Sequence, residues 1–408
     1  MTALAKKFPR RARCLTSVLI CLSILRVFIG AILRDSGTER SVVESRREII
    51  ARQSRLRRDR DANSTTNEGY LYRDVKRGAD GSLIMAFYFP QYHFAPENAM
   101  QMRTYATKTT SGNDLYTDWD VVKAHNGSRS FTPKRYYNLA NPSVFDTQDE
   151  LAHTWGVGVF IFYHYWLDNS MVLNLPVDVY LTKKRKTKFL LCWDNESGFL
   201  GKQLYDSPEK HAYQLLRYFL SENYLTDVNG RKPFLIYLTA KLDVVYLNRL
   251  IRFLETHGVL VTIGHNYQSY KNNWELPEWS EIASEFGPHA DGGPQRANLY
   301  EYVVRNPDND ISWSSPAFKQ YWQGAITSWD SRPRCYSGRT HQTQCKGDAP
   351  NGQVSPEGFG ALLRQIKANF HPMNKDRVIT IFAWNEWAEG AALEESEEFG
   401  LQFLEKLV

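Results

Sequence analysis

Short apolar runs recur along most of this chain, and each run ends in polar and aromatic residues. Such runs, when turn residues bound them, are typical of strands that are buried on both faces. The six clear runs are 83–89, 157–166, 188–193, 233–238, 259–264 and 378–384, and two weaker candidates lie near 289–292 and 325–329. Amphipathic stretches that suit helices lie between the runs, at 211–224, 244–258 and 359–370. This alternation predicts right-handed β-α-β units and a parallel sheet.

Eight candidate strands in one domain favour a (β/α)8 barrel, the TIM barrel, over an open doubly wound sheet. A barrel of this kind needs roughly 250 residues, and residues 82–408 supply enough chain. No Gly-x-Gly-x-x-Gly motif follows the first run, which weighs against a dinucleotide-binding fold. The predicted fold class is therefore α/β.

The basic charge of the chain is confined to its N-terminal segment. Residues 1–60 hold 15 of the 50 Lys and Arg but 5 of the 45 Asp and Glu. The rest of the chain holds 35 basic against 40 acidic side chains. The body is thus mildly acidic and gives no argument for a nucleic-acid partner.

Residues 14–33 are mostly apolar, and their number is about the twenty that span a bilayer as a helix. We predict a cytoplasmic basic tail at 1–13, a signal anchor at 14–33, a solvated basic stem at 34–81 and a catalytic domain at 82–408. Arg26 interrupts the apolar span. A cleaved signal peptide and an Arg-rich transit peptide stay open as alternatives.

Other features favour a body in the lumen of an organelle. Asn63, Asn126 and Asn195 each begin an acceptor sequon for glycosylation. Asn195 also follows a predicted strand, where we expect a binding site, so Asn63 and Asn126 are the glycosylation candidates. Cys335 and Cys345 share one polar loop and are candidates for a disulfide in an oxidising compartment. We expect a single-pass type II membrane protein with a lumenal catalytic domain in the Golgi or the endoplasmic reticulum.

The ends of the predicted strands carry the residue types that a sugar site needs. Reactive groups of (β/α)8 barrels collect where strands end. Here aromatic rings suit sugar faces, carboxylates suit proton transfer and amides suit hydroxyl groups, which together predict an oligosaccharide or glycan site without a cofactor. The candidate substrate-binding residues are Tyr88, Gln91, Tyr92, His93, Tyr163, His164, Trp166, Trp193, Asp194, Asn195, Glu196, Trp329, Asp330, Arg334, Asn385 and Trp387.

Several members of this set have structural alternatives. The His residues could cap backbone groups in the core, and the Trp residues could serve core packing alone. For Asp330 and Arg334 we favour a structural ion pair at the rim over a catalytic role. Asp194, Glu196 and Asp330 could ligate a divalent cation, but no compact oxygen-rich loop surrounds them, so we predict no metal.

Glu386 and Glu389 are the candidate catalytic residues. They lie three residues apart after the last predicted strand, and on a helical turn their Cβ atoms would be about 5–6 Å apart. Retaining glycosidases need two carboxyl groups roughly 5–5.5 Å apart. Burial beside Trp384 and Trp387 would raise the pKa of at least one carboxyl group, leaving one acid and one base. The alternative is a solvated charge pair, because an acidic run follows at 394–398.

Six segments, in this order, resemble the WbsX-like family, which is related to the endo-α-mannosidase family of retaining glycoside hydrolases. They are FYFPQYHFAPEN (87–98), TDWDVVKA (117–124), FYHYW (162–166), CWDNE (192–196), SWDSRPR (328–334) and AWNEWAEGAALE (383–394). The resemblance covers about residues 82–408 and implies a (β/α)8 barrel that acts on glycans. In the related endomannosidases the first Glu of the last motif is thought to deprotonate the sugar 2-hydroxyl, which displaces the leaving group internally. The second Glu is the acid and then the base. Carried over by motif, Glu386 takes the first role and Glu389 the second.

The chain departs from the family pattern in two segments. Residues 99–120 lack the paired tryptophans that usually follow the Glu-Asn pair, and Asp118 stands where Glu is usual. Asp194 stands where Ala is common, and residues 197–199 replace the usual Asn-Trp. We expect these segments to line the glycan groove, so the family's sugar specificity does not carry over.

The sequence therefore predicts an enzyme that cleaves or transfers a glycosidic bond in an oligosaccharide with retention. One alternative is a glycosyltransferase that uses an activated sugar donor, as the family name suggests, although no Asp-x-Asp motif lies at a predicted strand end. A second alternative is a barrel that binds glycans without turning them over. A membrane-tethered structural protein is a more distant possibility.

Overall fold

The computed structural model describes residues 70–95, 117–124, 132–197, 200–266, 279–285, 300, 318–330, 333 and 354–408. Several predictions lie outside these residues and stay predictions: the tail, the span at 14–33, most of the stem, Asn63, Asn126, Arg334, Cys335 and Cys345. Among the residues that are described, no helix is both long and apolar enough to cross a membrane.

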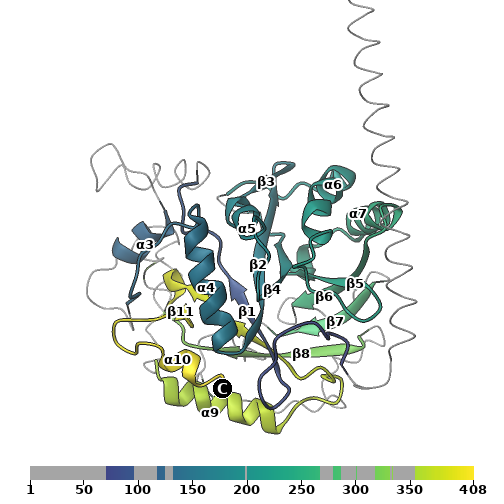
Figure 1. Ribbon diagram of the computed structural model, residues 1–408. Coiled ribbons are helices and arrows are strands. Elements are labelled where there is room, and N and C mark those ends of the chain that lie inside the picture. The colour runs from purple at the N-terminus through teal and green to yellow at the C-terminus, as the bar shows by residue number, and fades with distance from the viewer. Residues whose placement is uncertain are drawn as a thin grey trace, which may run out of the picture. The chain divides into compact units, whose positions relative to one another are not determined.

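Eight parallel strands close into a barrel (Figure 1). The order is β1-β9-β8-β7-β6-β5-β4-β2, and β1 pairs with both β9 and β2, which closes the barrel. A short strand, β3 (Ser170–Val172), adds to β2 in antiparallel direction. The barrel strands are β1 (Leu83–Tyr88), β2 (Val157–Leu167), β4 (Lys188–Asp194), β5 (Arg231–Ile236), β6 (Leu260–Asn266), β7 (Ser280–Ser284), β8 (Gln320–Ile326) and β9 (Val378–Phe382). The α/β class and the closed parallel barrel are those that the sequence predicts.

The described helices lie outside the strands (Figure 1). Three of them begin at a polar N-cap residue. The side chains of Asn141, Asp243 and Ser355 each accept a backbone N–H group in the first turn of the helix that follows. The helices are α3 (Asp118–Ala124), α4 (Pro142–Thr154), α5 (Leu175–Tyr180), α6 (Pro208–Phe219), η1 (Thr239–Lys241), α7 (Val244–Thr256), α9 (Pro356–Ala368) and α10 (Gln402–Glu405). A hairpin follows β9 and comprises β10 (Asn385–Glu386), η6 (Trp387–Glu389) and β11 (Ala391–Ala392).

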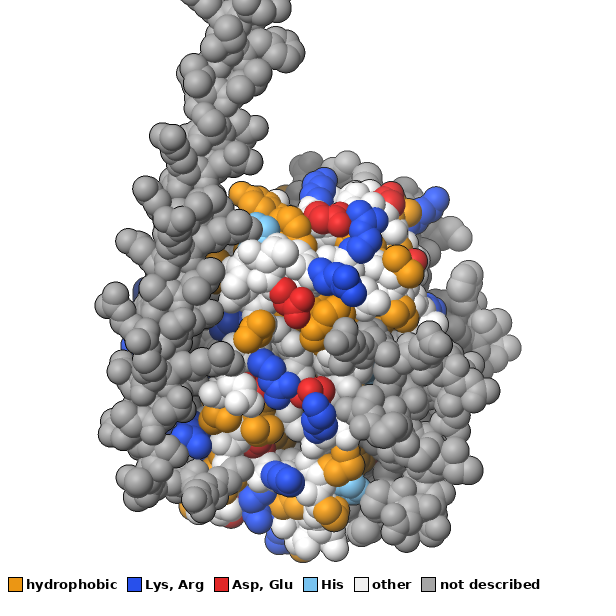
Figure 2. All heavy atoms as spheres, turned by 90° about the vertical axis from the view of Figure 1, so that its right-hand side faces the viewer, with side chains coloured by type: hydrophobic (Ala, Val, Ile, Leu, Met, Phe, Trp, Pro, Cys, Tyr) orange, Lys and Arg blue, Asp and Glu red, His pale blue; other side chains and the backbone are white. Residues whose placement is uncertain are grey.

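The outer surface near α6 and α7 is mixed in character. Figure 2 shows Lys and Arg side chains interspersed with acidic and apolar ones on this face. An example is the pair of Arg249 on α7 and Glu209 on α6, whose closest nitrogen and oxygen atoms lie 2.9 Å apart.

The two weaker strand predictions were misplaced. The sixth barrel strand is β7 at Ser280–Ser284, whereas the segment near 289–292 lies outside the described residues. The seventh strand is β8 at Gln320–Ile326, so the prediction at 325–329 overlaps its end alone. Ser280 and Ser284 are buried in β7, and Gln320 and Gln323 are buried in β8. These polar residues interrupt the apolar run that marks the other strands.

The segment before β1 packs against the amino-terminal ends of the strands. Asp376, just before β9, accepts the N–H groups of Leu71 at 3.1 Å and Tyr72 at 3.2 Å and pairs with Arg77 at 2.8 Å. Gly158 in β2 allows the close approach, because a Cβ there would lie 2.3 Å from the carbonyl oxygen of Lys76. This end of the barrel is therefore covered by protein, which leaves the opposite end for a site.

A charged network ties strand starts together at the same end. Arg231 of β5 donates to the Asp227 carboxylate at 2.9 Å and pairs with Glu281 of β7 at 2.5 Å. Glu281 also pairs with Lys319, next to β8, at 2.5 Å. The Asp227 side chain is fully buried and the Arg231 side chain is 25% exposed, so the pair is poorly screened by solvent.

Replacing Arg231 by Met is expected to lower the free energy of unfolding by about 2–4 kcal/mol, because it leaves Asp227 buried without its cation. Arg249→Met is the matched control, since its pair with Glu209 is about half exposed on both sides and is worth less than about 1 kcal/mol. Denaturant unfolding of both variants measures the difference. Equal losses would contradict the network's role.

Candidate active site

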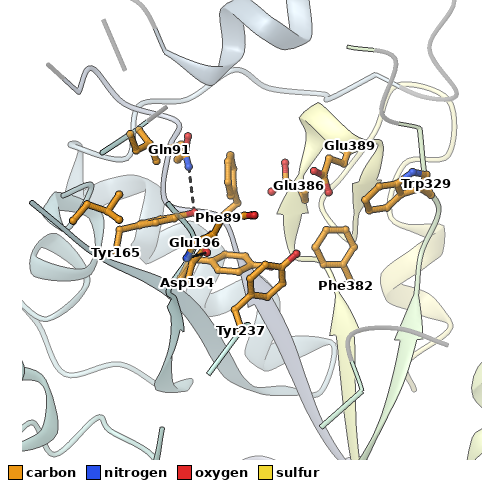
Figure 3. A pocket seen from close by; sticks show the side chains of 13 residues that line it. Phe89, Gln91, Tyr165, Asp194, Glu196, Tyr237, Trp329, Phe382, Glu386 and Glu389 are labelled. Carbon is orange, nitrogen blue, oxygen red and sulfur yellow. Dashed lines mark hydrogen bonds between the residues drawn. The ribbon is translucent and has the colours of Figure 1, made fainter. Parts of the chain in front are cut away.

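A cavity of about 240 Å³ opens at the carboxyl ends of the barrel strands (Figure 3). Its described lining combines aromatic rings, two leucines, one amide and four carboxylates. None of these lining residues is Lys or Arg. The lining residues are Phe89, Gln91, Tyr163, Tyr165, Leu167, Asp194, Glu196, Leu200, Tyr237, Trp329, Phe382, Glu386 and Glu389.

Glu386 and Glu389 project into this cavity from the hairpin that follows β9. Glu386 ends β10 and precedes the 3-10 helix η6, of which Glu389 is the last residue. Glu386 is the residue just before this turn, and the side chains of both glutamates line the same cavity. Figure 3 shows both carboxylates pointing into the cavity. Glu386 is 3% exposed and Glu389 is half-buried, so neither belongs to a solvated run.

The turn that carries the two glutamates is held by the loop after β8. The backbone N–H of Asp330 donates to the Glu389 carbonyl oxygen at 2.6 Å, and the Ser328 hydroxyl donates to the Gly390 carbonyl oxygen. Gly390 has a φ of +62°, and a Cβ there would lie 2.7 Å from the Asp330 Cβ. A side chain at position 390 would thus collide with the loop, and glycine is required.

Asn385 ties the same turn to β1. Its Oδ1 accepts the Phe89 N–H at 2.8 Å, and its Nδ2 donates to the Phe89 carbonyl oxygen at 3.1 Å. Phe89 lines the cavity. Asn385 therefore positions two parts of the wall and does not itself line the cavity.

The facing wall carries a second acidic pair. Asp194 ends β4 and Glu196 follows it, and both line the cavity. Lys241 pairs with Glu196 at 2.8 Å at the exposed rim. Burial raises the pKa of Tyr237 well above its usual range, and the negative charges of Asp194, Glu389 and Glu196 raise it further. The electrostatic potential inside the cavity is therefore negative, and the Tyr237 hydroxyl keeps its proton.

Aromatic rings complete the wall. Trp329 is half-buried, and its ring centroid lies 5.7 Å from that of Phe382. On the other side, the Gln91 amide donates to the Tyr165 hydroxyl at 3.2 Å (Figure 3). Rings and hydroxyl-binding groups around a carboxylate pair suit a sugar ring. Within the described chain, no three His, Cys, Asp or Glu residues form a cluster that could hold a metal ion.

The structure sorts the predicted site residues into two groups. Seven of them line the cavity: Gln91, Tyr163, Asp194, Glu196, Trp329, Glu386 and Glu389. Ten lie elsewhere: Tyr88, Tyr92, His93, His164, Trp166, Trp193, Asn195, Asp330, Asn385 and Trp387. Four of these ten lie inside barrel strands, namely Tyr88, His164, Trp166 and Trp193. Successive side chains of a strand point to opposite faces, and the prediction includes whole strand ends without this alternation.

The outward-facing residues of β2 and β4 require a correction. His164 and His211 of α6 lie with their Nε2 atoms 2.7 Å apart, and Trp166 stacks on His211 with ring centroids 4.5 Å apart. Trp193 packs edge-on against His211 and is fully buried. Burial lowers the pKa of His164 to about 3. These side chains form the interface between the strands and α6 and cannot stack on a ligand in this cavity.

The other residues outside the cavity have structural partners of their own. Asn195 donates to the Leu238 carbonyl oxygen at 2.9 Å and accepts the Leu238 N–H at 2.8 Å, which joins the ends of β4 and β5. Tyr92 stacks on Trp119 with ring centroids 4.0 Å apart. His93 is buried, which lowers its pKa to about 4, and it is therefore neutral.

Six lining residues were missed by sequence reasoning: Phe89, Tyr165, Leu167, Leu200, Tyr237 and Phe382. The alternation of side chains along β2 could have revealed two of them. Since Tyr163 faces the cavity, Tyr165 and Leu167 on the same strand must face it as well. The position of Tyr237 depends on where β5 ends, which the apolar run at 233–238 did not show.

The alternative to a catalytic pair placed Glu394 in a solvated acidic run, whereas the structure buries it behind the hairpin. Its Oε2 accepts from the Tyr137 hydroxyl and from the Trp387 indole N–H, both at 2.8 Å. Its Oε1 accepts from the Gln148 amide at 2.6 Å. Burial raises the pKa of Glu394 to about 7, although these hydrogen bonds act in the opposite direction.

This pKa predicts how stability depends on pH. The folded chain holds the Glu394 proton more tightly than an unfolded chain, where the usual value is 4.5. The stabilisation is therefore fully present below about pH 4.5 and is lost as the pH rises through about 7. Relative to Glu394→Gln, which has no such proton, the wild type should lose about 1–3 kcal/mol of unfolding free energy between about pH 5 and pH 8. Denaturant titrations at both pH values measure this loss, and a difference that does not change with pH would refute it.

Comparison with known sequences gives one family and two relatives. The family described as Glycosyltransferase WbsX matches residues 84–261 and 294–407. Two proteins called Uncharacterized protein WxcX, from two strains of Xanthomonas campestris pv. campestris, are 26% and 27% identical over 356 residues. These matches cover 79% of this chain and 48% of each relative, so the chain spans about half the length of the curated relatives it matches.

One similar solved structure supports the fold. A protein described as a glycoside hydrolase-like protein aligns with a TM-score of 0.52 and 12% identity, over 84% of this chain and 96% of that one. Two structures of a GH99 endo-alpha-mannosidase from Bacteroides thetaiotaomicron align with TM-scores of 0.47. The one in complex with BIS-TRIS-propane is 13% identical and covers 77% of this chain and 87% of that one. The other is 14% identical and covers 79% and 95%.

Proposed function

This chain belongs to the Glycosyltransferase WbsX family, and from that premise we propose that it is a carbohydrate-active enzyme that cleaves or transfers a glycosidic bond with retention. The substrate is an oligosaccharide or a longer glycan. The carrying observation is that Glu386, at the end of β10, and Glu389, at the end of η6, both point into one aromatic-lined cavity. Paired carboxyl groups beside one sugar are what both steps of a retaining reaction require.

In the first step, Glu386 acts as the base. Its carboxylate removes the proton of a sugar hydroxyl next to the anomeric carbon, and that oxygen attacks the anomeric carbon from the face opposite the leaving group. The bond to the leaving oxygen breaks, and Glu389 donates its proton to that oxygen. The sugar is left with an internal three-membered ring, and both protons are accounted for.

The second step reverses these roles. Glu389, now a carboxylate, removes a proton from water or from the hydroxyl of an acceptor sugar. The activated oxygen opens the internal ring at the anomeric carbon, and Glu386 returns its proton to the neighbouring hydroxyl. Two inversions give net retention. Water as the acceptor gives hydrolysis, and a sugar hydroxyl gives transfer.

The family description favours one second candidate, a glycosyltransferase that uses an activated sugar donor. The two candidates differ in what they release. The full chain is incubated with a glycan panel and, separately, with nucleotide sugars and glycan acceptors. Products are read by mass. Cleaved or rearranged glycans without a nucleotide support the proposal, whereas nucleoside diphosphate release supports the second candidate. Glycan binding without any product would indicate a non-catalytic barrel.

Amide variants of the two glutamates test their roles. Glu389→Gln removes the proton donor and Glu386→Gln removes the base, and each should lower turnover by about 10²–10⁴-fold. Glu405→Gln is the control, because Glu405 is exposed on α10 and should leave turnover unchanged. Turnover is measured on the glycan from the panel that wild type processes fastest. If Glu389→Gln kept wild-type turnover, the assignment of the acid would be wrong.

A further inference from the structure

Glu394 is a buried carboxylate that the proposed reaction does not use. It does not line the cavity, and it lies five residues beyond Glu389 at the end of the hairpin. We propose that Glu394 is a positioning residue: its carboxylate fixes the turn that carries Glu386 and Glu389 by holding Trp387 and, through Tyr137, Asn385. The inference rests on the proposed function for its catalytic readout, and it also predicts a backbone effect that needs no activity.

The first contact acts directly on the turn. Trp387 lies between the two glutamates in sequence and begins η6. Its indole is 3% exposed, and its N–H donates to Glu394 Oε2 at 2.8 Å. A rigid, buried ring that is fixed at its nitrogen leaves the backbone of η6 little freedom to rotate. Rotation of η6 would move Glu389 relative to Glu386, which ends β10 just before it.

The second contact reaches the turn through two further side chains. The Tyr137 hydroxyl donates to Glu394 Oε2 at 2.8 Å and accepts from Asn385 Nδ2 at 3.2 Å. Asn385 precedes Glu386 and makes both hydrogen bonds to the Phe89 backbone. Glu394 is thus linked to both sides of the cavity wall, at Glu386 and at Phe89.

The third contact anchors the carboxylate to the outer layer. The Gln148 amide of α4 donates to Glu394 Oε1 at 2.6 Å, and Gln148 Oε1 accepts from the Tyr88 hydroxyl of β1 at 2.5 Å. Figure 1 shows the hairpin segment, in yellow, beside α3 and α4. The carboxylate therefore connects the hairpin to α4 and to the first barrel strand.

Packing alone does not require a carboxylate here. An apolar side chain of similar volume often stabilises a buried site as well as a charged group does, or better. Among the described ion pairs, none involves Glu394. What the carboxylate supplies is two acceptor atoms for three donors that converge from different elements. That is the property expected of a group whose role is orientation.

Three variants separate this role from ordinary packing. Glu394→Leu fills the space but leaves the donors of Tyr137, Gln148 and Trp387 without an acceptor. Glu394→Gln keeps one oxygen for Tyr137 and Trp387, and the Gln148 amide can turn to match the new NH2 group. Tyr137→Phe removes a single hydroxyl and breaks the link to Asn385. Glu405→Gln is again the surface control.

On the glycan that wild type processes, Glu394→Leu should lower kcat by about 10–100-fold with little change in KM, because misplaced catalytic groups cost turnover more than binding. Tyr137→Phe should lower kcat in the same direction by a smaller factor. Glu394→Gln should keep kcat within about threefold of wild type. Wild-type kcat in Glu394→Leu, or equal losses in the Leu and Gln variants, would overturn the inference.

Hydrogen–deuterium exchange gives a readout that does not depend on activity. Peptides that cover residues 385–393 should exchange faster in Glu394→Leu than in wild type, whereas peptides from β4 and β5 should not change. Unchanged exchange at 385–393 would overturn the positioning role even in a protein without turnover. A wild type that turns over no glycan, with faster exchange in the Leu variant, would instead reject the proposed function and leave the positioning role supported.

Discussion

The site depends on one turn of backbone, the 3-10 helix between Glu386 and Glu389. Glu386 directly precedes this turn and Glu389 ends it, and both side chains line the cavity, whereas residues three apart in an extended strand point to opposite faces. The turn closes at Gly390, whose positive φ and lack of a Cβ let the Asp330 backbone approach and hydrogen-bond to the Glu389 carbonyl. Everything that the cavity can do chemically follows from this local geometry.

The rest of the fold holds that turn in place and shields it partly from solvent. The closed barrel places the ends of β1, β2, β4 and β5 opposite the hairpin, so that aromatic rings and the second acidic pair face the two glutamates. Behind the hairpin, Glu394 accepts hydrogen bonds from α4, from η6 and from the loop before α4. Charges that are held in a site of low dielectric act strongly on one another and on a ligand. Burial raises the pKa of Tyr237, and the nearby carboxylates raise it further.

Much of this could be predicted from the sequence, because buried parallel strands leave long apolar runs and a family motif marks the last one. Six of the barrel strands and the pairing of Glu386 with Glu389 at a strand end follow from such local signals. The strands β7 and β8 could not be placed well, since buried Ser residues interrupt the pattern of β7 and buried Gln residues interrupt that of β8. Gln323 has its partners at His371 and Asn374, in the loop before β9. Alternation along a strand puts His164 on the face opposite Tyr163, but which of the two faces points into the barrel depends on the strand's place in the sheet. The burial of Glu394 depends on its contact with α4, so it was not visible in composition or spacing.

The central claim is that two carboxyl groups on one turn act on the same sugar in two successive displacements. The most direct test is a proton NMR time course of the first product that the full chain releases, recorded before the free sugar equilibrates in solution. We predict that the anomeric configuration of the substrate is kept in that product. A first product of inverted configuration would show a single displacement by water, and it would contradict the pairing of Glu386 and Glu389 on which the mechanism is built.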